Sequence, residues 1–196
     1  GFMIKELLDG YLRIFPDEAE DLKDATNLAN QEMSSELEIT NRKNFTGHFT
    51  TSSFIICPKE KKILLLEHKS LNKLLQPGGH IEEYDKTPLD AALRELKEET
   101  GQNPDNFTYI QVDPENYLVP FRVDSHPIPE NSKKHEGAHM HHDFGYLFVS
   151  DCIKEIKVDQ DESNGFRWID LEVFYELPTF KKISSKVQNF LAKYHV

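Results

Sequence analysis

The feature that most constrains this chain lies between residues 76 and 101, where a double glycine precedes a helix with strong signals at both ends. Thr87 followed by Pro88 is typical of a helix start, because the threonine oxygen caps backbone N–H groups and proline lacks one. Asp90, three residues after Thr87, completes a pair like a capping box. Gly101 predicts the helix end, since glycine readily adopts the left-handed conformation required there.

The helix expected between these signals has two chemically different faces. Its apolar stripe, which we expect to be buried, consists of Leu89, Ala92, Leu93 and Leu96. A second face carries three carboxylates spaced three and four residues apart, Glu95, Glu98 and Glu99. Carboxylates on one patch repel each other, and a hard divalent cation with oxygen ligands removes that repulsion. Arg94 stands four residues before Glu98, so it can pair with and orient a carboxylate.

Just upstream of the helix, Gly78 and Gly79 allow the backbone to turn sharply and to approach a ligand closely. The whole arrangement of turn, double glycine, capped helix, carboxylates and glycine stop resembles the Nudix box. That family's pattern is Gly, five residues, Glu, seven residues, then Arg-Glu-hydrophobic-any-Glu-Glu-any-Gly-hydrophobic. Residues 94–101, Arg-Glu-Leu-Lys-Glu-Glu-Thr-Gly, match its second half without a break.

The first half of the chain's motif departs from the family pattern. Counted from Gly79, the first Glu position holds Asp85, and eight residues rather than seven separate it from the arginine. Counted back from the arginine, the same position holds Lys86, and the final hydrophobic position holds Gln102. One extra residue in the loop before the helix accounts for this spacing and leaves the role of the loop open.

The resemblance implies a hydrolase that depends on Mg²⁺, with Mn²⁺ as a substitute. It would cleave a diphosphate bond in a nucleoside diphosphate linked to another group. By resemblance, the metal ligands are Glu95, Glu98 and Glu99, helped by a backbone carbonyl near Gly78, and Arg94 steadies the glutamates. The metals would grip the diphosphate oxygens and lower the pKa of a bound water, which then attacks one phosphorus. The motif selects the reaction rather than the substrate.

The general base and the substrate contacts are expected outside the metal-binding helix. In the family the base often stands on a loop, and Glu162, six residues before Trp168 in an acidic loop, is a candidate. An ordinary exposed loop acid is an equal alternative for Glu162. Substrate contacts are expected at the mouth of the cleft, from Gln76, Gly78, Gly79 and His80.

Apolar patterns along the rest of the chain predict an α+β fold with a mixed sheet between helices. The resemblance implies that this fold is a Nudix-type α/β/α sandwich. The expected strands lie at residues 53–57, 62–66, 107–112, 117–123, 144–149 and 166–169. Residues 1–42 are expected to form an N-terminal helical extension, and residues 43–196 the Nudix domain. A lid that packs on the core is favoured for the extension over a dimerisation arm or a substrate cover, which leaves a homodimer open.

Four histidines crowd into eight residues, His135, His139, His141 and His142, and Asp143 follows them. If residues 139–141 are extended, His139 and His141 point the same way, and a zinc or manganese site can form. The alternative, which we favour, is a polar loop that leads into the strand at Phe144.

Charge and cysteine content limit the classes of partner and the cellular location that we expect. The formal net charge of −11 repels phosphate backbones and anionic membranes, so we expect a small nucleotide-like substrate rather than duplex nucleic acid or a membrane. Two cysteines, Cys57 and Cys152, follow no metal-ligand spacing and suggest no disulfide framework. With no signal pattern at the N-terminus, a cytoplasmic location is expected.

Two rival functions belong to other classes. The first is a Nudix-like domain that binds a ligand without catalysis, and the presence of all three glutamates argues against it. The second is an isomerase of prenyl diphosphates, which would need a catalytic cysteine deep in the cleft. Cys57 is the only tempting residue for that role, and a buried, inert thiol would remove the idea.

Overall fold

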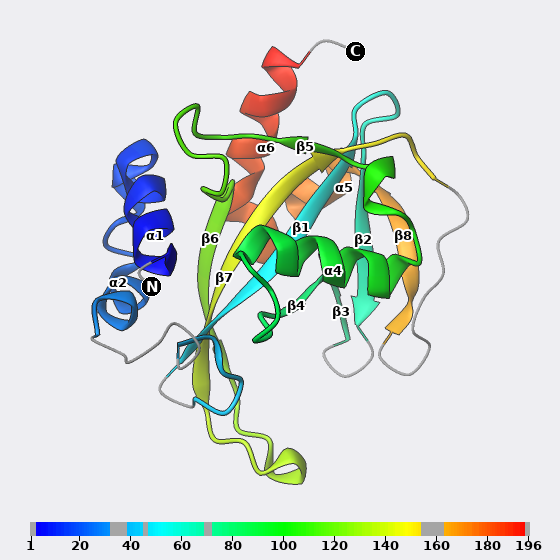
Figure 1. The fold of residues 1–196 in the computed structure, drawn as a ribbon. Coiled ribbons are helices and arrows are strands. Elements are labelled where there is room, and N and C mark those ends of the chain that lie inside the picture. The colour runs from blue at the N-terminus through cyan, green and yellow to red at the C-terminus, as the bar shows by residue number, and fades with distance from the viewer. Residues whose placement is uncertain (1–2, 32–38, 45–46, 69–71, 154–162, 195–196) are drawn as a thin grey trace. The chain divides into compact units, whose positions relative to one another are not determined.

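The computed structural model describes residues 3–31, 39–44, 47–68, 72–153 and 163–194 (Figure 1). The chain divides into two units. The first consists of Gly1–Ser52, Gly78–Glu95 and Gln111–Tyr146, and the second of Ser53–Pro77, Leu96–Ile110 and Leu147–Val196. Three elements contribute residues to both units: β1 (His48–Cys57), α4 (Pro88–Thr100) and β7 (His139–Val149).

The N-terminal helices belong to the first unit, where α1 (Met3–Ile14) and α2 (Lys23–Asn30) lie side by side (Figure 1). α1 buries Ile4, Leu7, Leu8 and Tyr11, which recur along the sequence at helical spacing. After α1 a 3-10 turn, Pro16–Glu18, brings Glu18 to the Tyr11 hydroxyl, which donates to it at 2.8 Å. Arg122, at the start of β6 (Arg122–Ile128), pairs with Glu18 at 3.1 Å, so these helices are anchored to the strands of the unit.

The strands of the first unit bring side chains of β1 and β7 together. The start of β1 pairs with β4 (Gly78–His80), and β6 (Arg122–Ile128) forms a hairpin with β7. The carboxylate of Asp143 on β7 accepts hydrogen bonds from two hydroxyls of β1, those of Thr50, at 2.8 Å, and Ser52. Burial raises the pKa of Asp143.

The strand predicted at residues 117–123 is wrong for most of its length, because the strand begins only at Arg122 and runs to Ile128. Residues 117–121 lie in turns and irregular backbone. The Asn116 side chain accepts a hydrogen bond from the Leu118 N–H, and Pro120 has no N–H for a ladder. The polar stretch thought to be a loop, residues 139–142, belongs to β7 instead.

The second unit holds the rest of the strands. Its strand order is β3-β2-β1-β7-β5, and β8 pairs with β2. The bounds are β2 (Lys62–His68), β3 (Lys73–Leu75), β5 (Thr108–Ile110) and β8 (Ser163–Asp170), with helices α5 (Leu171–Glu176) and α6 (Lys181–Lys193). Its core is built on Ile55, Ile56, Ile63, Leu64 and Leu65, which are fully buried. Strands and helices follow the predicted α+β class.

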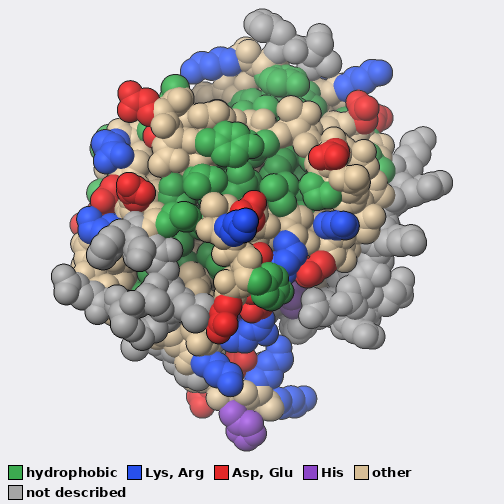
Figure 2. All heavy atoms as spheres, in the orientation of Figure 1, with side chains coloured by type: hydrophobic (Ala, Val, Ile, Leu, Met, Phe, Trp, Pro, Cys, Tyr) green, Lys and Arg blue, Asp and Glu red, His purple; other side chains and the backbone are tan. Residues whose placement is uncertain are grey.

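The surface carries both signs of charge. On the face drawn in Figure 2, Lys and Arg side chains stand among Asp and Glu side chains, although the whole chain has a net charge of −11. In the described part of the chain, no helix is both long and apolar enough to cross a bilayer.

The close packing around Gly78 in β4 predicts that a larger residue at this position destabilises the fold. A Cβ at this position would lie 2.5 Å from the Thr51 carbonyl oxygen and 3.0 Å from the Ser52 Cα, and these backbone atoms are held in the β1–β4 ladder. Gly78→Ala should therefore destabilise the fold by about 1–3 kcal/mol, as overpacking does. Thermal unfolding would show a Tm several degrees lower. Gly137→Ala, where an added Cβ meets nothing within 4 Å, is the control, and equal Tm values for both variants would contradict the packing argument.

Candidate active site

The helix α4 forms as its sequence signals predict. The Thr87 hydroxyl accepts a hydrogen bond from the Asp90 N–H at 3.0 Å, and the helix ends before Gly101, which has a φ of 70°. The buried face consists of Leu89, Ala91, Ala92 and Leu96. Leu93, predicted to be buried, is only half-buried. This packing sets the rotation of the helix about its axis and therefore the direction of its carboxylate face.

All three candidate metal ligands lie on α4, where the spacing of three and four residues puts them on one side of the helix. Glu98 is exposed, whereas Glu95 and Glu99 are half-buried. Carboxylate oxygens are the donors that a hard divalent cation prefers, and water reaches this face. The donor set therefore fits a magnesium-type ion.

The double glycine allows close contact between β4 and the first of these glutamates. A Cβ at Gly79 would overlap the carboxyl group of Glu95, so the strand backbone lies directly against that carboxylate. This is the close approach expected for the double glycine, made here to a side chain of the chain itself. Gly78 and Gly79 are both half-buried.

Arg94 is the residue that holds Glu95 in place. Its guanidinium donates to Glu95 Oε1 at 3.1 Å and to the backbone carbonyl of His80 at 3.0 Å. Two further bonds reach Asp85, from Nε to Oδ1 at 2.9 Å and from Nη2 to Oδ2 at 2.8 Å. These hydrogen bonds and the negative charge of Asp85 raise the pKa of Arg94 above its usual range, so the guanidinium is always charged.

The contacts of Asp85 explain the irregular first half of the motif. Its side chain is only 4% exposed and also accepts a hydrogen bond from the Glu82 N–H at 2.8 Å, whereas Lys86 is exposed. Of the two countings of the motif, the one from Gly79 therefore identifies the residue that reaches Arg94. The loop with the extra residue places a carboxylate on the guanidinium.

Removing the charge of Asp85 should reduce stability. The Asp85–Arg94 pair is largely buried, with side chains 4% and 18% exposed, and loss of one partner leaves the other charge poorly compensated. We expect Asp85→Asn to lower the free energy of unfolding, measured with urea, by about 2 kcal/mol or more. Glu82→Gln, which breaks the more exposed Arg42–Glu82 pair, should lower it by less than about 1 kcal/mol. Equal effects of the two substitutions would contradict the assignment.

His80, predicted to contact substrate, lies in a cluster of histidines within the first unit. Its ring centroid is 5.3 Å from that of His48 and 5.7 Å from that of His141. His139 lies 5.2 Å from His48, and His126 lies 5.7 Å from His141. Burial is the main cause that lowers the pKa of His80 to about 4 and that of His141 to about 2, so both rings are neutral near pH 7.

The cluster confirms one part of the histidine prediction and corrects another. His139 and His141 point the same way from β7, and their Nε2 atoms are 3.2 Å apart. His135 instead caps an exposed turn, and His142 is bonded through Nδ1 to the Ser125 hydroxyl at 2.7 Å. The sequence pattern did not reveal His48, since it joins through strand packing from a distant part of the chain.

The positions of the other candidate residues, Gln76, Glu162 and Cys57, say little about their proposed roles. Gln76 is half-buried in the connection between β3 and β4, and Glu162 lies outside the described residues. Both roles therefore stay predictions. Cys57 is buried in β1, and its thiol lies 4.0 Å from a carboxylate oxygen of Glu60.

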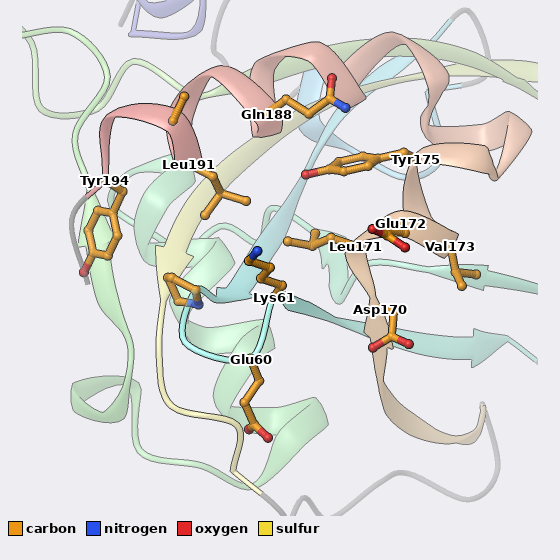
Figure 3. A pocket seen from close by; sticks show the side chains of 12 residues that line it. Glu60, Lys61, Asp170, Leu171, Glu172, Val173, Tyr175, Gln188, Leu191 and Tyr194 are labelled. Atoms are coloured by element: carbon orange, nitrogen blue, oxygen red, sulfur yellow. The ribbon is translucent and has the colours of Figure 1, made fainter.

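The second unit contains a groove of about 740 Å³ (Figure 3). Its polar lining includes Glu60, Lys61, Asp170, Glu172 and Gln188, and apolar lining comes from Leu171, Val173 and Leu191. None of the candidate site residues described above is among those that line it.

The family model described as the NUDIX domain matches residues 47–190, well over half of the chain. A relative described as a probable DHNTP pyrophosphohydrolase, from Lactococcus lactis subsp. cremoris (strain MG1363), is 35% identical over 114 residues. The match covers 58% of this chain and 61% of the relative, so the chain spans about three fifths of the relative's length.

Solved structures show the same fold. A NUDIX family hydrolase from Clostridium perfringens is 26% identical with a TM-score of 0.57, and the match covers 74% of this chain and 97% of that one. The E. coli dihydroneopterin triphosphate pyrophosphohydrolase, at 17% identity, has a TM-score of 0.57 and coverages of 74% and 96%. At that identity the likeness shows the fold alone. Together with the match of the family model and the motif on α4, these findings show that the chain belongs to the Nudix family.

Proposed function

We propose that this protein is a metal-dependent hydrolase that cleaves a diphosphate bond in a small nucleotide-like molecule, of the type nucleoside diphosphate linked to another group. The observation that carries the proposal is the position of the Glu95 carboxylate. It lies against the backbone of Gly79 and is held by Arg94, which Asp85 fixes in turn. Such a supported carboxylate at the head of an acidic helix face is suited to bind a cation and, through it, phosphate.

The proposed metal ligands are Glu95, Glu98 and Glu99, with a backbone carbonyl near Gly78. When bound, Mg²⁺, or Mn²⁺ as a substitute, polarises phosphate oxygens and lowers the pKa of a water. Arg94 orients the Glu95 carboxylate. Glu162 is the proposed general base, which would take the proton from the attacking water.

The substrate class follows from the family and from charge. Dihydroneopterin triphosphate heads the list of candidates, because the relative at 35% identity is named a probable DHNTP pyrophosphohydrolase. Gln76, His80 and the backbone of Gly78 and Gly79 are the proposed substrate contacts. The net charge of −11 disfavours duplex nucleic acid and anionic membranes as partners.

The proposal includes three further predictions, on the cellular location, the domain division and the oligomeric state. A cytoplasmic location agrees with the two free cysteines, Cys57 and Cys152. The division into a helical extension, residues 1–42, and a catalytic domain, residues 43–196, is tested by expressing the second part alone. A homodimer is tested by measuring the mass of the protein in solution.

The deciding experiment measures phosphate, pyrophosphate and nucleotide release with Mg²⁺ across a panel. The panel contains dihydroneopterin triphosphate, nucleoside triphosphates, ADP-ribose, dinucleoside polyphosphates, nucleotide sugars and coenzyme A. We expect turnover of at least one class, abolished by a chelator and restored by Mg²⁺. Tight binding of one compound without turnover would overturn the proposal in favour of a ligand-binding domain. In a separate assay with a prenyl diphosphate, isomerisation together with labelling of a reactive Cys57 would favour the isomerase.

A further inference from the structure

Three imidazoles of the first unit converge in a way that the proposed hydrolase reaction does not use. The ring nitrogens of His48, His139 and His141 that could bind a metal all lie within 4.8 Å of one another. His48 and His139 are buried, at 1% and 7% exposure, and His141 is half-buried. Alternation along the strands explains the meeting, because His48, Thr50 and Ser52 share one face of β1, as His139, His141 and Asp143 share one face of β7.

Backbone carbonyls determine which nitrogen is available on two of the rings. His48 Nδ1 lies 3.3 Å from the Asn44 carbonyl oxygen, and His139 Nδ1 lies 2.8 Å from the Gly137 carbonyl oxygen. A carbonyl oxygen only accepts, so both Nδ1 atoms carry the hydrogen. In the neutral rings Nε2 is then the atom with the free lone pair. Metal-binding histidines are commonly oriented by the same kind of bond from their other nitrogen.

The Nε2 atoms of His48 and His139, which have the free lone pairs, lie close to the other rings of the cluster. His48 Nε2 is buried and has no hydrogen-bond partner among the residues that the structure describes. His139 Nε2 faces His141 Nε2 at 3.2 Å. With Zn–N bonds of about 2.0–2.1 Å, two ligands of a tetrahedral zinc ion stand about 3.3 Å apart, so this pair already has the separation of metal ligands.

We propose that His48, His139 and His141 bind one transition-metal ion of the zinc type, at a site separate from the acidic face of α4. Imidazole nitrogen suits zinc and its first-row neighbours, whereas magnesium prefers oxygen, so the two sites differ in the metals they select. Three protein ligands leave a fourth tetrahedral position open, as in zinc sites that hold a water.

The surroundings of the site are built mainly from further histidines. His80 lies 5.7 Å from His141 between ring centroids and has its backbone carbonyl on Arg94. His126 stands opposite His141 in the β6–β7 ladder, and its Nδ1 lies 2.9 Å from an Asp124 carboxylate oxygen. His80 thus connects the proposed zinc site with the residue that orients Glu95, although the inference does not depend on the proposed reaction.

The test titrates the metal-free full chain with Zn²⁺ against a chromophoric chelator, in excess Mg²⁺ to occupy carboxylate sites. We expect one Zn²⁺ per chain. His141→Ala and His139→Ala should each weaken binding by more than the roughly 10–100-fold that loss of an outer hydrogen-bond partner causes. His135→Asn, in the exposed turn of the same hairpin, is the matched control and should bind as the parent does.

A second measurement keeps the proposal testable if a variant unfolds. Imidazole nitrogen NMR spectra of the parent should show three rings shifting with one equivalent of Zn²⁺ and none shifting with Mg²⁺. The proposal is overturned if the parent binds no Zn²⁺, or if histidine variants that remain folded bind it as tightly as the parent. It is equally overturned if Cys152→Ser alone abolishes binding, since Cys57, Glu60 and Cys152 form another group with ligand atoms within 4.8 Å of one another.

Discussion

Glu98→Gln is expected to reduce kcat by about a hundredfold or more on the substrate found in the panel. The amide keeps the size of the side chain but removes the charge that binds the cation, whose electrostatic contribution to such reactions is several kcal/mol. A loss of about 3 kcal/mol corresponds to about a hundredfold in rate. Because Glu98 is exposed, its replacement should leave Tm almost unchanged.

Asp90→Asn is the matched control for this substitution. Asp90 is an exposed carboxylate on the same helix, and its side chain has no proposed ligand role. The pair should be compared as kcat and as the concentration of Mg²⁺ that gives half-maximal rate. If Glu98→Gln and Asp90→Asn retain equal activity, Glu98 is not a metal ligand.

Gly79→Ala is the second substitution expected to have a large effect, and it should act on activity more than on stability. The new methyl group would overlap the Glu95 carboxyl group, which is the mobile end of a flexible side chain. That side chain can swing away, so the fold survives, but the carboxylate leaves the position that Arg94 maintains. A displacement of about 1 Å in a catalytic group costs on the order of a hundredfold in rate.

The neighbouring glycine provides a sharp contrast. At Gly78 the added atom meets backbone rather than the end of a side chain, so the main loss there is stability. We therefore expect Gly79→Ala to be folded and nearly inactive, with the Tm of Gly137→Ala. An active Gly79→Ala enzyme would show that the position of Glu95 does not matter for the reaction.

The helix of the site could be predicted closely because its signals are local. The Thr87 cap, the Gly101 stop and the spacing of the glutamates act within a few turns of one helix. The partners of Arg94 were harder to predict. They are Asp85 and Glu95, and Asp85 comes from the loop with irregular spacing. Local signals could not decide whether Asp85 or Lys86 would face the guanidinium.

The histidine cluster and β6 show where sequence reasoning stops. His48 and His139 lie far apart in the sequence, and only the pairing of strands brings them together. For β6, the apolar residues before Arg122 suggested an earlier strand, yet turn-forming side chains and Pro120 delay its start. The first outcome depends on contacts distant in sequence and the second on local turn-forming residues, and apolar periodicity is insensitive to both.

The most direct test of the central claim is the fate of water in the reaction. The protein is incubated with the substrate identified in the panel, in water labelled with an oxygen isotope, with Mg²⁺ or with a chelator. The products are then examined by phosphorus NMR and mass spectrometry. Our account predicts one labelled oxygen on a phosphate product of diphosphate cleavage, only when Mg²⁺ is present, and much slower appearance of that product with Glu98→Gln. Cleavage that continues in the chelator, or products without the label, would contradict metal-dependent hydrolysis.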